Sequence, residues 1–176
     1  MSVRRWLLSG ALALAMACGA SQDTGEGSAA PEGLQIAGVY QVTGVTIGLE
    51  DGLQRPIHGS VKLLVEDGLY TAHVELDTYF PGSEARAARV VGTGDGRIEG
   101  RVLEGMVHTQ LVAASVPGVD VGFAFVPREV GPRIRSRSRA EFLPEGSVHI
   151  ELENEPEPGE QYRPTRTELV GYRREG

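Results

Sequence analysis

From Leu34 onward, apolar and polar residues alternate with a period of two rather than the 3.6 residues of a helix. Breaks containing glycine or proline separate the alternating segments at regular intervals, which is typical of antiparallel sandwiches and barrels. The pattern predicts an all-β domain over residues 34–176, an up-and-down meander of about 8–10 strands. We expect a closed or nearly closed barrel, because closure removes exposed sheet edges; a β-sandwich is the alternative.

Two hairpins can be placed in register from their turns. Asp67-Gly68 favours a two-residue turn, which sets Val65 opposite Tyr70 and His58 opposite Asp77. A three-residue loop at 144–146 sets Phe142 opposite Val148. In both hairpins one face is then apolar and the other polar, so the register is well specified.

The remaining elements are predicted from local signals. A third hairpin is expected at Glu104-Gly105, with Arg101 opposite His108 and Glu99 opposite Gln110. Further strands are expected near residues 36–47, 89–93, 119–126 and 165–174. Asp95, between two glycines, is expected in a turn, and residues 83–89 are the best candidate for a short helix.

The first 17 residues have the three-part layout of a secretory signal peptide. Arg4 and Arg5 precede an apolar stretch from Trp6 to Ala17, which is shorter than the ~20 residues that cross a bilayer as a helix. The segment 14–18, Leu-Ala-Met-Ala-Cys, resembles the lipobox of bacterial lipoproteins. The resemblance implies acylation of Cys18, export, and a lipid anchor in the cell envelope, with the outer membrane implied by Gly19.

Residues 19–33 are rich in glycine, serine, alanine and acidic residues, so we expect 18–33 to be the lipidated cysteine and a flexible tether. Removing residues 1–17 takes away two of the 17 basic residues and makes the chain more acidic than its net charge of −7. An acidic surface argues against general nucleic-acid binding, which depends on basic patches. Cys18 is the sole cysteine, so no disulfide is expected within one chain.

Two segments resemble the opening and closing of lipocalin or calycin barrels. Gly38-Val39-Tyr40 stands where those barrels have Gly-x-Trp, and the chain closes on Tyr172-Arg173-Arg174, where they have a late arginine. The resemblance implies a barrel, and in such barrels a ligand lies inside. We therefore expect a small apolar or amphipathic ligand or an envelope protein as the partner, and no cofactor.

The polar face of the Asp67-Gly68 hairpin is one candidate site. It gathers five residues with ionisable side chains: His58, Lys62, His73, Glu75 and Asp77. His58 opposite Asp77 could form a carboxylate-oriented imidazole, and the cluster could bind a divalent metal. A solvent-facing surface of cross-strand charge pairs is the alternative, and we assign no metal or catalytic residue.

A second candidate site is a basic ladder in the segment Arg-Ile-Arg-Ser-Arg-Ser-Arg, which places Arg133, Arg135, Arg137 and Arg139 on one face. Guanidinium groups could bind phosphate or carboxylate groups there. The alternative is a ladder of ion pairs. The register of the hairpin at residues 144–146 sets Arg139, Arg137 and Arg135 opposite Glu151, Glu153 and Glu155. In the long loop that follows, Tyr162 and Arg163 are weaker candidates.

No hydrolase, nucleotide-binding or EF-hand motif occurs in the sequence. The sequence therefore favours a non-enzymatic envelope lipoprotein whose tethered barrel binds a small apolar or amphipathic ligand. One alternative is a structural module that docks on envelope proteins. The other is a metal-dependent or acid/base enzyme that uses the polar face of residues 57–78. A cavity of a few hundred Å³ favours ligand binding, whereas a solid core favours docking.

Overall fold

The computed structural model describes residues 35–118, 122–127, 133–154, 156 and 163–174. They form nine strands: β1 (Gly38–Gly48), β2 (Gln54–Glu66), β3 (Leu69–Tyr79), β4 (Arg86–Glu99), β5 (Val102–Gly118), β6 (Gly122–Pro127), β7 (Arg133–Phe142), β8 (Ser147–Asn154) and β9 (Thr165–Arg173). No helix in this part of the chain is long and apolar enough to cross a membrane.

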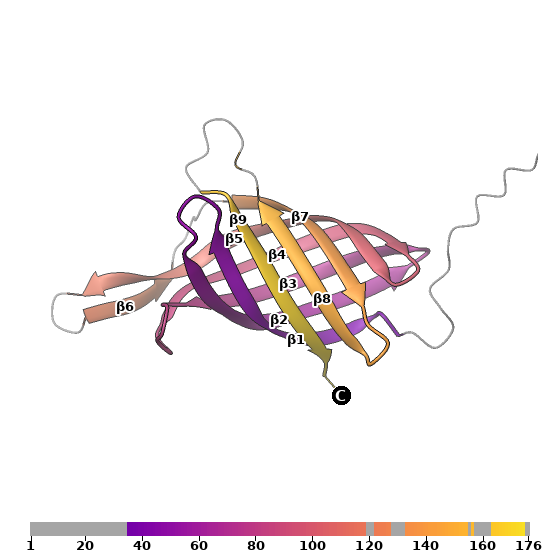
Figure 1. The fold of residues 1–176 in the computed structure, drawn as a ribbon, viewed down its shortest axis with the longest axis horizontal. Helices are drawn as coiled ribbons and strands as arrows, with labels where there is room; N and C mark the ends of the chain where they lie inside the picture. The colour runs from indigo at the N-terminus through magenta and orange to yellow at the C-terminus, as the bar shows by residue number, and fades with distance from the viewer. Residues whose placement is uncertain (1–34, 119–121, 128–132, 155, 157–162, 175–176) are drawn as a thin grey trace, which may run out of the picture.

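Eight of the strands close into an antiparallel up-and-down barrel (Figure 1). Each strand from β1 to β5 pairs with the next, β7 follows β5 in the ring, and β9 returns to pair with β1. The ninth strand, β6, pairs with the distal part of β5 outside the ring. The fold is therefore the predicted all-β meander in its closed form, and it is compatible with a lipocalin-like barrel.

The registers predicted for two hairpins are confirmed. Val65 lies opposite Tyr70 and His58 opposite Asp77, around a turn in which Asp67 and Gly68 both have positive φ, 49° and 74°. Phe142 lies opposite Val148, and Gly146 has the left-handed φ of 89° that a three-residue loop needs. In both cases the turn residues and the apolar alternation specify the same pairing.

The prediction of a third hairpin at Glu104-Gly105 is wrong. The chain reverses at Gly100, where φ is 61°, so that Glu99 pairs with Val102 and not with Gln110. His108 accordingly lies opposite Thr93 rather than Arg101. Residues 86–99 form a single strand, which replaces the predicted strand at 89–93, the turn at Asp95 and the short helix at 83–89.

Gly96 and Gly105 allow two strands to approach closely and do not lie in turns. Gly96 lies opposite Gly105, and a Cβ atom on Gly105 would come within 2.0 Å of the carbonyl oxygen of Asp95. The Tyr70 side chain packs over both glycines, 2.7 Å from where either Cβ would stand, and its hydroxyl lies 3.0 Å from that of Ser138. Glycine inside a strand marks such close contacts as well as turns, which explains the wrong prediction.

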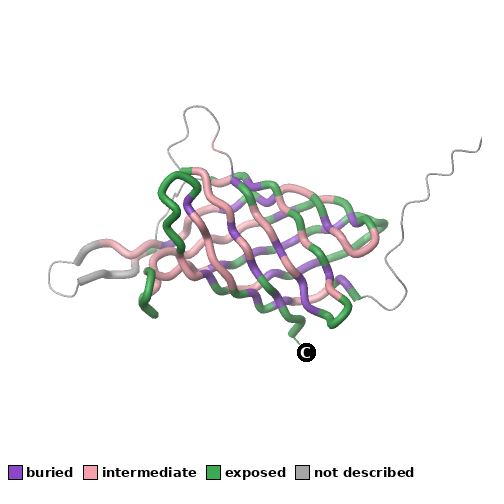
Figure 2. Tube along the Cα trace, viewed as in Figure 1, coloured by how far each residue is buried: buried purple, intermediate pink, exposed green. Residues whose placement is uncertain are grey.

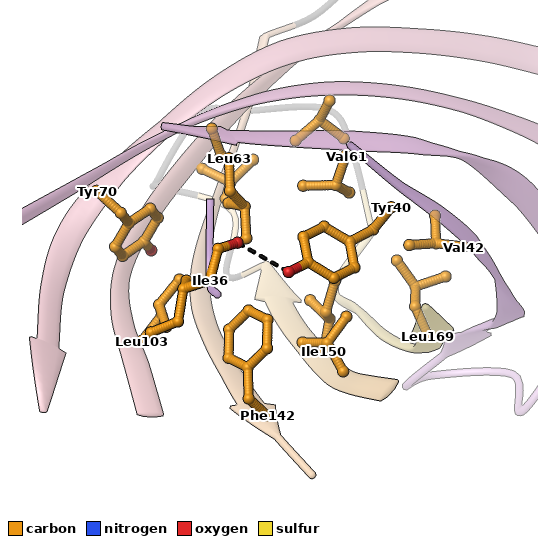
Figure 3. Packing of buried hydrophobic residues seen from close by; sticks show 14 of the residues in the cluster. Ile36, Tyr40, Val42, Val61, Leu63, Tyr70, Leu103, Phe142, Ile150 and Leu169 are labelled. Carbon is orange, nitrogen blue, oxygen red and sulfur yellow. Dashed lines mark hydrogen bonds between the residues drawn. The ribbon is translucent and has the colours of Figure 1, made fainter. Parts of the chain in front are cut away.

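The buried apolar residues form one core cluster, and they recur along the strands of the barrel (Figure 2). Buried residues alternate with exposed ones along β3, and the most deeply buried side chains include Tyr40, Phe142 and Leu103. The rings of Tyr40 and Phe142 meet edge to face, with centroids 5.6 Å apart (Figure 3). An eight-stranded barrel is just wide enough for side chains to fill its interior.

One end of the barrel is closed by the segment that precedes β1. Ile36 is buried in the core although it lies outside any strand, and its carbonyl oxygen accepts a hydrogen bond of 2.8 Å from the Tyr40 hydroxyl (Figure 3). Arg173, opposite Tyr40 on β9, donates to the Gln35 side chain at 2.6 Å. The two residues on which the lipocalin resemblance rests are thus neighbours at this closed end.

Candidate functional site

Among the described residues, a small cavity lies in the barrel interior. Its volume is about 40 Å³, and its lining is almost entirely apolar, with Val61, Tyr70, Leu103 and Leu169 among the residues around it. Pockets for small molecules usually have volumes of ~300–1,000 Å³. The apolar faces predicted from the alternation therefore surround a packed core.

The predicted polar cluster lies on the outer face of β2 and β3. His58 is opposite Asp77, Ser60 opposite Glu75 and Lys62 opposite His73, as the register predicted. His58, Lys62, His73 and Glu75 are exposed, whereas Asp77 is partly buried. Among the described residues, no three histidine, cysteine or acidic side chains come close enough together to hold a metal ion.

Within this cluster, Asp77 pairs with arginine rather than with histidine. Arg89, next to it on β4, donates from Nε and Nη2 to the two carboxylate oxygens at 2.7 and 2.8 Å, and Arg86 Nε lies 3.6 Å away. The hydrogen bonds from Arg89 lower the pKa of Asp77, against the opposing effect of burial, with Arg86 adding to the shift. Asp77 is therefore an ionised carboxylate, and both of its oxygens accept hydrogen bonds from Arg89.

His58 has other partners. Its Nδ1 lies 2.8 Å from the Thr43 hydroxyl, and its ring meets that of Tyr79 edge to face, with centroids 5.2 Å apart. The sequence placed His58 and Asp77 side by side but missed Arg89. The signal for Arg89 was the register between β3 and β4, which could not be derived while residues 83–89 were expected to be helical.

The arginine ladder occupies the outer face of β7. Arg139 lies between Glu151 of β8 and Glu104 of β5, and it forms its ion pair with Glu104. Arg137 is opposite Glu153 and Arg133 opposite Gln110. The predicted partner of Arg135, residue 155, lies outside the described residues.

A fifth arginine, which sequence reasoning missed, joins this surface from β9. Arg166 Nη2 lies 3.3 Å from Glu151 Oε1, and Arg166 Nε lies 3.0 Å from Glu168 Oε1. A shallow depression of about 480 Å³ runs over these strands, lined by Arg137, Arg139, Arg166 and by acidic residues. The surface therefore carries both signs of charge in alternation, which suits a polar protein surface better than a simple anion.

Of the remaining candidates, the structure describes Arg163, which lies at one end of the barrel. Arg163 is exposed and pairs with Asp51 at 3.3 Å and Glu50 at 3.8 Å, which joins the β8–β9 loop to the β1–β2 loop. Cys18 and Tyr162 lie outside the described residues. At the closed end, burial raises the pKa of Tyr40, with Arg173 opposing the shift, so its phenol remains a neutral hydrogen-bond donor.

Comparison with known proteins adds no relative. No family model matches the chain, and neither a curated protein nor a solved structure is similar enough to match it.

Proposed function

We propose that this chain is an exported lipoprotein of the cell envelope, anchored in the outer membrane through Cys18. In this proposal residues 19–33 are the spacer, and the barrel is a non-enzymatic interaction module that docks on other envelope proteins. The membrane is then reached through the lipid alone, which agrees with the acidic net charge of −7.

The observation that carries this proposal is the small size of the interior cavity that the described residues surround. A cavity of about 40 Å³ has room for one or two water molecules, so it favours recognition by the outer surface over binding of an apolar ligand inside the barrel. The outer surface offers a mixed-charge depression of about 480 Å³, a feature that suits a folded protein partner.

The same geometry lends less support to acid/base chemistry on the polar face. A general base works best with a pKa near the working pH, but the hydrogen bonds from Arg89 lower the pKa of Asp77 below its ordinary value. His58, Lys62 and Glu75 lie on an open sheet face rather than in a cleft. We therefore favour docking over an enzymatic function.

The experiment is mass spectrometry of the protein extracted in mild detergent from its own envelope. We expect a chain that begins at Cys18 and carries acyl groups, with no small molecule retained at one per chain. A Cys18→Ser variant, as control, should keep its fold and lose the acyl mass. A chain with unmodified Cys18 would contradict the lipoprotein part of the proposal. A small molecule retained at one per chain would favour ligand binding over docking as the function of the barrel.

A further inference from the structure

Part of the chain projects from the barrel as a two-stranded ribbon. Residues 113–118 of β5 pair with residues 122–127 of β6 and form a ribbon, here called the arm. Ala113 and Ala114 at its base still pair with β4, and beyond Ala114 the arm projects from the eight-stranded ring (Figure 1). The arm lies at the opposite end of the barrel from Gln35 and Arg173, because β5 runs away from the closed end. An isolated two-stranded ribbon is only marginally stable in water, so pairing with a further strand would stabilise the arm.

The arm has an open backbone edge. Among the described strands, the eight strands of the ring are paired on both sides, whereas β6 pairs with β5 alone. Its other edge therefore presents a row of backbone N–H and C=O groups with which another β-strand can pair. Lipid cannot form such hydrogen bonds, so the edge matches a β-strand rather than a membrane.

The edge also lacks the usual protection against pairing. Proteins guard sheet edges with charged residues and prolines, but residues 113–118 and 122–127 include no charged residue. Pro117 interrupts the β5 edge, and Pro127 stands at the end of β6, which leaves residues 122–126 of β6 without a proline. The β6 edge is thus the one left suited to pairing.

A second copy of the chain provides the matching strand. An antiparallel edge paired with itself across a two-fold axis is self-complementary, and the uncharged arm adds no repulsion at the contact. The projection of the arm keeps the two acidic barrels apart, each with a net charge of −7. We propose that the chain forms a dimer in which β6 of one copy pairs antiparallel with β6 of the other.

β6 has six residues, so the contact is small and we expect weak association. The inference does not depend on the proposed lipid anchor or on docking to envelope proteins.

The test is sedimentation velocity of the full chain in mild detergent over a wide range of concentrations. We expect the wild-type protein to pass from monomer to dimer, and Val126→Lys to weaken dimerisation by about tenfold or more, because a lysine on each edge repels its copy. The matched control is Val170→Lys, the same change at a partly exposed position of β9, a strand paired on both sides. It should dimerise like the wild type.

Amide hydrogen exchange gives a readout that does not need a variant. The amides of residues 122–126 should exchange more slowly at high than at low protein concentration, while the amides of β3 remain unchanged. A wild-type chain that stays monomeric at every concentration would overturn the proposal. So would a dimer that Val126→Lys leaves intact, or one that forms without protecting the amides of residues 122–126.

Discussion

At the scale of single residues, inward-facing glycines decide how closely the strands can approach. Gly44, Gly59, Gly96 and Gly105 each lie against the backbone of a neighbouring strand, where a Cβ atom would come within 2.1 Å of a carbonyl oxygen. Such contacts leave no room for a side chain, so the backbone can bend and coil strongly at these points. The high glycine content is therefore a feature of the barrel wall as much as of its turns.

Gly105→Ala should destabilise the protein by about 3 kcal/mol, because both the β4 backbone at Asp95 and the Tyr70 side chain must move. Gly52→Ala is the control, since Gly52 has a positive φ of 65° but open space around it, and the strain there costs about 1 kcal/mol. Urea unfolding of both variants measures the difference. Equal losses would contradict the close-approach role.

The ion pair of Asp77 makes a prediction about pH. Arg89→Gln should lower stability at neutral pH by about 1 kcal/mol, a modest value because the Arg89 side chain is 42% exposed. Folding lowers the pKa of Asp77 below its ordinary value of 3.8, so the stabilisation is present above that value. It is lost as the pH falls through the folded-state pKa, where the carboxyl group becomes protonated.

Urea unfolding of the wild type and of Arg89→Gln at pH 7 and in strong acid measures this effect, with Arg97→Gln on the same strand as the control. The gap between wild type and Arg89→Gln should close in acid. A gap of the same size at both pH values would show that the contribution of Arg89 does not depend on an ionised Asp77.

At the scale of strands and hairpins, the sequence predicted those elements whose turn residues and apolar alternation agreed. The hairpins at Asp67-Gly68 and at residues 144–146 have both signals, and their registers are confirmed. In residues 86–105 the signals conflicted. Gly94, Gly96 and Gly105 read as turn residues, yet they lie inside strands against Tyr70 or neighbouring backbone, and this tertiary contact is invisible in a local pattern.

The candidate sites follow the same division. The cross-strand neighbours of His58 and Arg137 were predictable because both lie in those two hairpins. Arg89 and Arg166, which bind Asp77 and Glu151, come from strands that join the sheet through longer connections. Their partners depend on the β3–β4 and β8–β9 registers, which no short turn motif in the sequence specifies.

Insertion of one glycine tests the corrected β4–β5 hairpin. Placed after Gly100, the insertion lengthens an exposed turn and should cost less than about 1 kcal/mol. Placed after Glu104, it shifts the rest of β5 by one position and turns Val107 and Thr109 outward, so the protein should not fold. Thermal unfolding followed by circular dichroism distinguishes the two. Equal tolerance at both sites would restore a turn at Glu104-Gly105.

At the scale of the whole molecule, the two barrel ends have different roles. The segment before β1 and the end of β9 meet at the closed end, where Ile36 plugs the core and Arg173 contacts Gln35. The arm projects from the other end (Figure 1). If the chain is tethered through Cys18, the anchor joins the closed end and the arm is directed away from the membrane that holds the lipid.

The filled interior leads to the last prediction. A fluorescent long-chain fatty acid needs several hundred Å³, so the native protein should show no saturable binding to a cavity of about 40 Å³.

Phe142→Ala removes the largest side chain next to Tyr40 and should cost about 3–5 kcal/mol of stability. If the variant remains folded, the space it opens should admit a benzene-sized molecule, detectable as a concentration-dependent rise in melting temperature that the wild type lacks. Saturable binding of the fatty acid to the wild type at one per chain would mean that the barrel opens in solution, and the case for recognition by its outer surface would fail.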